Sequence, residues 1–194
     1  MAKSTNSKTS LTPVILVLVG EKLSGKEMSA RYLVKKYGFV SYRFSRILTD
    51  ILQRLRLPVS RVNEVQLVGG LREHFGGGVL AKVIKAEIEQ HGFRRVVIDG
   101  LRHPSEYEVL KKLPGFKLVY LTAPLELRYQ RAVARGEKVG ESNFTLSQFK
   151  LEENLPTEIF IRALAKKAKV KLVNNGSLAD LYQQIEQKII KKLK

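Results

Sequence analysis

Two glycines and a lysine near the start of the chain have the spacing G-x-x-x-x-G-K, which is typical of loops that bind phosphate. The segment reads Gly20-Glu21-Lys22-Leu23-Ser24-Gly25-Lys26. An apolar run from Val14 to Val19 precedes it, and apolar residues at helical spacing follow, which is the strand–loop–helix context that the motif requires. In that context backbone N–H groups form a concave anion site at the positive end of the helix. We therefore expect this segment to hold the phosphates of a nucleotide, with Lys26 on the outer phosphates.

The residue after the lysine departs from the usual pattern. Ser or Thr normally stands there and binds Mg²⁺ through its hydroxyl, whereas this chain has Glu27. A carboxylate in the first helical turn suits the helix dipole, but it repels phosphate unless a cation lies between them. We therefore expect Glu27 to contact Mg²⁺, directly or through water.

The elements that must position these residues alternate between short apolar strands and amphipathic helices. Strand patterns cover residues 14–19, 39–44, 96–98, 116–121 and 170–173. Helical periodicity covers residues 28–37, 47–55, 68–75, 80–88, 104–113, 124–135, a helix behind Thr145 and a last one behind Ser177. Thr145 with Gln148 fits a capping box. The alternation predicts an α/β protein whose parallel sheet is covered by helices on both sides.

Length and composition exclude several classes of protein. A chain of 194 residues fits one domain. The absence of cysteine excludes disulfides, thiolate metal sites and a cysteine nucleophile, and the three histidines are too far apart to suggest a metal site. Residues 1–13 read as a flexible basic tail, and no apolar run approaches the roughly 20 residues of a membrane span. We expect a soluble, cytoplasmic protein, as a monomer or a homodimer.

The high positive net charge indicates that the protein could bind an anionic partner. The chain has 35 Lys and Arg against 18 Asp and Glu, a formal charge of +17, which favours polyanions or serves only to keep the protein soluble. A stretch without acid holds Arg162, Lys166, Lys167, Lys169 and Lys171, and more lysines follow at the C-terminus. These runs lack aromatic residues placed for base stacking, and no recognition-helix motif is present. Nucleic acid is therefore the second choice of partner, after nucleotide phosphates.

From Val14 to the last helix the chain resembles P-loop kinases of small nucleotides. It is most similar to dephospho-CoA kinase-like and deoxynucleoside monophosphate kinase-like proteins, a group often named AAA-family ATPases. The segments that carry the resemblance, in this order, are GEKLSGKE, YRFSRILTDIL, LREHFGGGVLA, VVIDGLRHPSE, LRYQRAVARG and LVNNGSLADLY. The resemblance implies the P-loop NTPase fold, with three α/β/α layers and a five-stranded parallel sheet over residues 14–194. It also implies a small lid at about residues 136–158, with ATP and Mg²⁺ as cofactors.

The resemblance also implies roles for individual residues. Asp99 would hold Mg²⁺ through water, although an Asp before Gly often only starts a turn. Arg102 would bind an acceptor phosphate. Arg131 would lie on the adenine and Arg135 near the transferred phosphate; their i, i+4 spacing places both on one helical face, which is also compatible with a solvated face. Asn174-Asn175-Gly176 resembles the loop that touches the adenine edge.

The acceptor is the least determined part of the prediction. Relatives commonly read F-S-D-I-L-R where this chain reads Phe44-Ser45-Arg46-Ile47-Leu48-Thr49, so the acid and the arginine that address a nucleoside monophosphate are replaced. Arg72, a lone arginine on an amphipathic helix, is expected to face solvent. The predicted function is transfer of the γ-phosphate of ATP to a small nucleotide-like acceptor, a nucleoside monophosphate or dephospho-CoA. The alternative is a catalytically degenerate nucleotide-binding protein or ATPase with a basic surface for nucleic acid.

Overall fold

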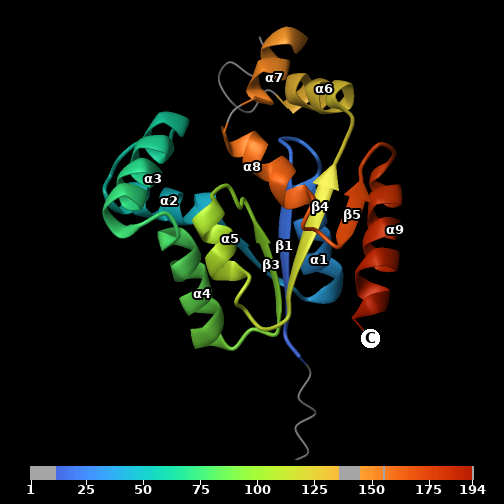
Figure 1. Cartoon of the computed structure of the whole chain (residues 1–194), viewed down its shortest axis with the longest axis horizontal. Coiled ribbons are helices and arrows are strands. Elements are labelled where there is room, and N and C mark those ends of the chain that lie inside the picture. Colours follow the sequence, from blue (N-terminus) through green and yellow to red (C-terminus); the bar gives the residue numbers. More distant parts are fainter. Residues whose placement is uncertain (1–11, 136–144, 155, 194) are drawn as a thin grey trace, which may run out of the picture.

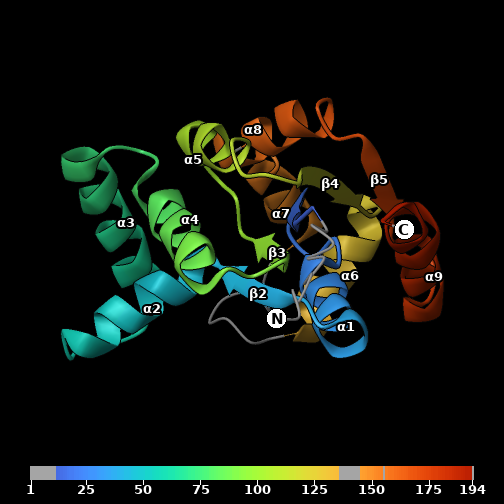
Figure 2. The same cartoon turned by 90° about the horizontal axis from the view of Figure 1, so that it is seen from below.

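The structure is a computed structural model, and it describes residues 12–135, 145–154 and 156–193. A five-stranded parallel sheet forms its centre. The strand order is β2-β3-β1-β4-β5, and every neighbouring pair is parallel. The strands are β1 (Val14–Gly20), β2 (Val40–Arg43), β3 (Arg95–Asp99), β4 (Phe116–Thr122) and β5 (Val170–Val173). Helices cover both faces of the sheet (Figures 1 and 2). The predicted fold class, a three-layer P-loop NTPase fold, is confirmed.

The central strand β1 explains why both faces are covered. Its side chains alternate between two cores: Ile15, Val17 and Val19 join one apolar cluster, and Leu16 and Leu18 join the other. Helices α4 (Val79–His91), α5 (Pro104–Leu110) and α8 (Pro156–Ala165) supply the first cluster. Helices α1 (Lys26–Tyr37) and α9 (Leu178–Lys188) supply the second, and the short helix η1 (Ile190–Lys192) follows α9. A strand that is buried on both faces reads as a continuous apolar run, as this one does.

Two helical pairs extend beyond the layers. Helices α2 (Phe44–Arg54) and α3 (Arg61–Phe75) project to one side, and α6 (Leu125–Arg135) and α7 (Leu146–Glu152) lie above the carboxyl ends of the strands (Figure 1). The predicted tail lies almost wholly outside the described residues. Of the predicted lid, residues 136–144 and 155 lie outside them, and the described part forms α7 and the start of α8.

Several element boundaries differ from the prediction, and the largest difference is in helix α3, which begins at Arg61 although the helix was predicted for residues 68–75. The strand predicted for residues 39–44 ends at Arg43, because Phe44 already belongs to helix α2 and is buried with Leu48 and Leu52 on one helical face. Helix α5 ends at Leu110, three residues before the predicted end. The capping boxes at Thr145 and Ser177 are present. Among the described residues, no helix is both long and apolar enough to cross a membrane.

Candidate functional site

The loop between β1 and α1 depends on two close approaches. A Cβ on Gly20 would lie 2.0 Å from the carbonyl oxygen of Leu121, and one on Gly25 would lie 2.3 Å from Nδ2 of Asn174. Gly25 also has a φ of +104°, in the left-handed region. Neither position accepts a side chain without displacing its neighbour. The spacing of the two glycines therefore reflects contacts with β4 and with the end of β5.

Two polar side chains brace this loop from the side of β5. Asn174, which is buried, donates through Nδ2 to the carbonyl oxygen of Ser24 (3.0 Å). Arg131 donates to the carbonyl oxygen of Leu23 (3.1 Å) and to both oxygens of Asn174 (3.2 Å each). Leu23 itself has a left-handed backbone, with φ 63°. The loop is thus held in shape by residues that lie more than 100 positions later in the chain.

Lys26 turns its amino group back onto the loop. Nζ donates to the carbonyl oxygens of Gly20 and Glu21, at 2.8 Å each. Burial is the main cause that lowers the pKa of Lys26 to about 8; the charge of Arg102 acts in the same direction, and the carboxylates of Asp99, Glu158 and Glu21 oppose it. A buried ammonium that is satisfied by two carbonyl groups can exchange them for phosphate oxygens, which carry full charge.

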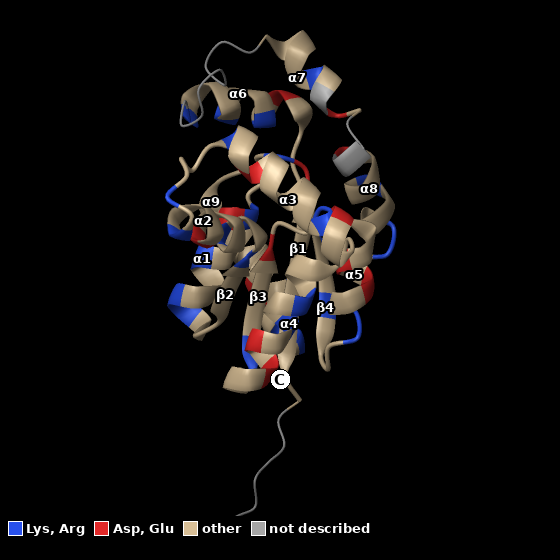
Figure 3. Ribbon diagram, turned by 90° about the vertical axis from the view of Figure 1, so that its left-hand side faces the viewer, with Lys and Arg blue, Asp and Glu red and all other residues tan. Residues whose placement is uncertain are grey.

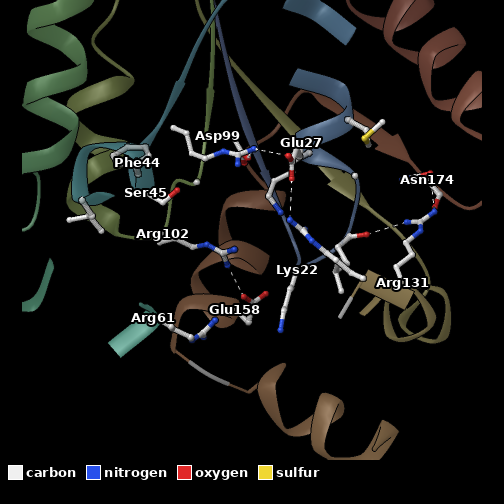
Figure 4. A pocket seen from close by; sticks show the side chains of 18 of the residues that line it. Lys22, Glu27, Phe44, Ser45, Arg61, Asp99, Arg102, Arg131, Glu158 and Asn174 are labelled. Atoms are coloured by element: carbon white, nitrogen blue, oxygen red, sulfur yellow. Dashed lines mark hydrogen bonds and ion pairs between the residues drawn. The ribbon is translucent and has the colours of Figure 1, made fainter. Parts of the chain in front are cut away.

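One cavity of about 970 Å³ collects most of the residues singled out in the sequence. The residues that line it include Lys22, Leu23, Gly25, Lys26, Glu27, Asp99, Arg102, Arg131, Arg135 and Gly176 (Figure 4). Within the loop, Gly20, Glu21 and Ser24 are buried, whereas Asn175 is exposed. Of the predicted adenine-edge loop, Asn174 and Gly176 line the cavity.

Arginines surround the carboxylates of Glu27 and Asp99, and one of them contacts both. The Glu27 carboxylate lies 2.8 Å from Arg31, 3.4 Å from Arg135 and 3.7 Å from Arg43. Arg43 also reaches Asp99 Oδ2 at 3.6 Å, so it links the two carboxylates. The other oxygen, Oδ1, is buried without a hydrogen-bond partner.

Two further ion pairs form the opposite wall of the cavity, and sequence reasoning missed both. Arg102 Nη1 lies 2.8 Å from Glu158 Oε1, and Arg72 Nη2 lies 2.7 Å from Glu106 Oε1. The expectation that Arg72 faces solvent is wrong, because its partner Glu106 is buried inside the fold and draws the guanidinium inward. A signal was present at Glu158, an acid on a helix that is otherwise largely apolar.

In the segment Phe44–Thr49, Arg46 replaces the acid that relatives carry, but its side chain lies outside the cavity. Phe44, Ser45 and Leu48 line the cavity. Arg46 is 80% exposed and lies 4.0 Å from Asp50, one turn along the same helix. The cations that face this part of the cavity instead include Arg43, Arg61 and Arg72.

A magnesium ion fits the cavity as a companion of phosphate. No group of three or more potential ligand side chains within the described parts of the chain could hold a metal ion unaided. The buried, unpartnered Oδ1 of Asp99 is the acceptor that a water molecule on Mg²⁺ requires. The ion would therefore bind through phosphates and water, as Mg²⁺ commonly does.

Comparisons with known proteins agree with this geometry at the level of the fold. No family model matches the chain. The solved structures that it resembles include shikimate kinase from Acinetobacter baumannii in complex with shikimate (TM-score 0.55, 19% identity, 93% of this chain and 94% of that chain). They also include dephospho-CoA kinase from Campylobacter jejuni (TM-score 0.52, 19% identity, 92% and 96%). The chain has the fold of a P-loop kinase.

Relatives by sequence are UPF0200 proteins of archaea. One from Methanosarcina mazei is 32% identical over 124 residues, which cover 63% of this chain and 66% of the relative, just under two thirds of its length. Another from Sulfurisphaera tokodaii is 25% identical over 174 residues, 89% of this chain and 94% of the relative. These names specify no substrate.

Proposed function

We propose that this protein is a phosphotransferase that moves the γ-phosphate of ATP to a small nucleotide-like acceptor, a nucleoside monophosphate or dephospho-CoA. The observation that carries the proposal is that one cavity gathers the glycine loop with Lys26, the acid Asp99 and the arginines Arg102, Arg131 and Arg135. Phosphoryl transfer needs positioning and charge neutralisation more than covalent chemistry. These residues supply both. An enzyme of this kind that uses ATP would act in the cytoplasm.

Each part of the cavity has a task in this proposal. The loop from Gly20 to Lys26 cradles the donor phosphates with its backbone N–H groups, and Lys26 leaves its two carbonyl partners for phosphate oxygens. Arg131 and Asn175-Gly176 flank the adenine, and Arg135 neutralises the transferred phosphate. Arg102 addresses the acceptor. Closure of the segments around the cavity would exclude water and suppress hydrolysis.

Glu27 and Asp99 would hold Mg²⁺ in this proposal. The ion, when bound, neutralises charge on the β- and γ-phosphates. Arg43 and Arg135 lie beside Glu27 in the absence of phosphate. Donor phosphates compete for both guanidinium groups, and Glu27 would then face the cation. Asp99 would contact a water molecule on the ion through Oδ1.

The direct test is a screen of acceptors with ATP and Mg²⁺. We expect the wild-type protein to form ADP and one phosphorylated acceptor, and Lys26→Ala to lose both reactions. Retention of transfer by Lys26→Ala would contradict the assignment of the loop. Failure of the wild-type protein to bind ATP would refute the proposal as a whole.

A second function is favoured by one observation, the gathering of lysines away from the cavity. Nζ of Lys167 lies 4.9 Å from the ring centre of Tyr107, and Nζ of Lys111 lies 5.7 Å from it, so two separate segments bring cations together. Separately, Lys188 donates to the backbone oxygen of Lys171 in β5, which brings two more lysines together. Such a surface attracts the phosphates of a nucleic acid, and a nucleotide-binding protein or ATPase that has lost acceptor phosphorylation would use it.

A further inference from the structure

Two carboxylate oxygens that are buried at the cavity lack a hydrogen-bond donor. They are Oδ1 of Asp99 and Oε2 of Glu158, and each residue is only 7% exposed. Buried polar atoms in folded proteins nearly always have a partner. An unpartnered acceptor in a cavity wall therefore indicates the place of a donor that the ligand brings. Asp99 Oδ1 faces the proposed Mg²⁺ water, which leaves Glu158 Oε2 to be explained.

Glu158 belongs to the phosphate end of the cavity. Its Oε1 is bound by Arg102 at 2.8 Å, and Figure 4 shows this pair near Arg61 on the wall opposite Arg131. The carboxylate also raises the pKa of Lys26 through its charge, as Asp99 does. Glu158 thus lies within the electrostatic reach of the loop that holds the phosphoryl donor in the proposed function.

The arginines beside Glu158 and Asp99 already pair with carboxylates. Arg102 is paired with Glu158, Arg72 with Glu106, and Arg43 lies between Glu27 and Asp99. An acceptor phosphate at the transfer point would bring a charge of about −1.5 to −2 beside two carboxylates whose cations are engaged. A hydroxyl brings no charge and one O–H donor, which is what Glu158 Oε2 lacks.

Helix α3 holds a buried hydrogen-bond donor that has no acceptor. The Nε donor of Arg72 is buried and has no partner, although Nη2 of the same side chain is bound by Glu106. Arg61 lines the cavity from the same helix. Phe44, Leu48 and Val68 supply apolar surface between these cations and the loop. This side fits an anionic group at a distance from the reacting atom.

We propose that the phosphoryl acceptor is an alcohol that also carries an acidic group, and that its reacting hydroxyl donates a hydrogen bond to Glu158 Oε2. The proposal rests on the proposed function and narrows it, because it selects an oxygen of an alcohol over an oxygen of a phosphate. The acidic group of the acceptor meets Arg61 and Nε of Arg72. Glu158 is a catalytic residue in this scheme.

The reaction balances with the groups present. The acceptor oxygen forms a bond to the γ-phosphorus of ATP, the bond from that phosphorus to the β–γ bridging oxygen breaks, and its electron pair leaves with ADP. The hydroxyl proton passes to Glu158 Oε2 and from there to water. Because the transition state of phosphoryl transfer is loose, Glu158 acts first by orienting the hydroxyl. Arg102 keeps the carboxylate in place through Oε1.

The test compares two acceptor panels with the full-length protein, ATP and Mg²⁺. One panel contains hydroxyl acceptors with an acidic group (shikimate, gluconate, dephospho-CoA), and the other contains nucleoside 5′-monophosphates. Phosphorus NMR separates a phosphate ester from a diphosphate product. ATP hydrolysis without an acceptor is measured as the background and is subtracted. ATP binding by the wild-type protein is measured first by calorimetry, because its absence would remove the proposed function and this inference together.

We expect ester formation with the acidic hydroxyl acceptors to exceed diphosphate formation. Glu158→Gln keeps the shape and an oxygen for Arg102, and it should lower kcat for these reactions by about 100-fold or more while KM for ATP stays within about twofold. Glu158→Asp, which keeps the carboxylate, should retain more activity than Glu158→Gln. Glu126→Gln, on an exposed acid of α6, should match the wild-type protein.

Two results would overturn the inference while the proposed function stands. One is a diphosphate product from a nucleoside monophosphate as the main reaction. The other is an unchanged kcat in Glu158→Gln. Thermal unfolding of each variant shows whether it is folded; a loss of kcat without a change in KM for ATP in a folded protein supports the catalytic role.

Discussion

At the scale of single residues, short-range spacing carried most of the information. Lys26 and its loop could be predicted because the motif and its flanking elements lie within a few residues of each other. The pairs Arg102–Glu158 and Arg72–Glu106 could not, because 56 and 34 residues separate the partners and only the fold brings them together. The sequence of an amphipathic helix does not show whether a charged side chain on it will pair with a buried residue elsewhere in the fold.

The lowered pKa of Lys26 predicts a pH dependence of ATP binding. In the ligand-free protein Lys26 loses its proton near pH 8, whereas bound phosphates favour the protonated form. Binding above pH 8 must therefore take up a proton, so affinity should fall by up to about tenfold per pH unit. Calorimetry from pH 7 to pH 9.5, in buffers of different ionisation enthalpy, measures both effects. Lys26→Arg, which stays charged, should lose this dependence; a flat profile for the wild-type protein would contradict the prediction.

Glu27 makes a second prediction at this scale. If it faces Mg²⁺ once phosphates have drawn Arg43 and Arg135 away, Glu27→Ala should raise the Mg²⁺ concentration needed for half-maximal ATP binding. Titration of Mg²⁺ at fixed ATP, followed by nucleotide fluorescence, measures this. Glu89→Ala removes an exposed acid that pairs with Lys85 one helical turn away and serves as control. An unchanged Mg²⁺ dependence in Glu27→Ala would exclude the role.

At the scale of elements, the sequence predicted the order of strands and helices better than their ends. Val14–Gly20 was recognisable because burial on both faces leaves a continuous apolar run. The boundary between β2 and α2 was not, since Phe44 suits either element and only its packing with Leu48 decides. The hydrogen bond from Asn174, at the end of β5, to the loop at Ser24 could not be predicted from local sequence patterns either.

Asn174 tests the importance of that bracing. Asn174→Ala would remove the amide that donates to the carbonyl of Ser24 and the Oδ1 that accepts from Arg131 Nη2, whereas the backbone oxygen of residue 174 would still accept from Arg131. We expect the free energy of unfolding to fall by about 1–3 kcal/mol, and ATP affinity to fall because the loop loses its shape. Chemical denaturation and calorimetry provide the two measurements. Gln183→Ala, on the exposed face of α9, should change the unfolding free energy by no more than about 0.5 kcal/mol.

Helix α3, which packs against α2, is weakly embedded in the fold. Helix α3 has no fully buried residue, and Val62, Val65 and Phe75 are 64%, 59% and 65% exposed. Few buried contacts give a low local stability. Hydrogen exchange of backbone amides should therefore be faster in α3 than in α1 or α4, and an acceptor in the cavity should slow it because Val65, Val68 and Arg72 line that wall. Equal protection in all three helices would show that α3 is rigid.

At the scale of the whole molecule, the charge of +17 divides between the site and the surface. Lys26, Arg102, Arg131 and Arg135 are accounted for by a polyphosphate, and Arg43 and Arg72 join them in the cavity. Most of the remaining basic residues lie outside it. Figure 3 shows Lys and Arg on several elements of one side, with Asp and Glu among them. The sequence predicted the surplus but not how the fold distributes it.

The surplus predicts binding of nucleic acid that depends on charge alone. Lys166, Lys167 and Lys169 are exposed, and contacts of this kind release counterions, so affinity for duplex RNA or DNA should fall steeply with salt and be independent of base sequence. We expect binding in 50 mM salt, measured by fluorescence anisotropy, and little at 200 mM. Replacing these three lysines by Gln should weaken it further and leave phosphoryl transfer unchanged, because none of them lines the cavity. Tight binding that persists at 200 mM salt would instead favour the nucleic-acid function over the kinase.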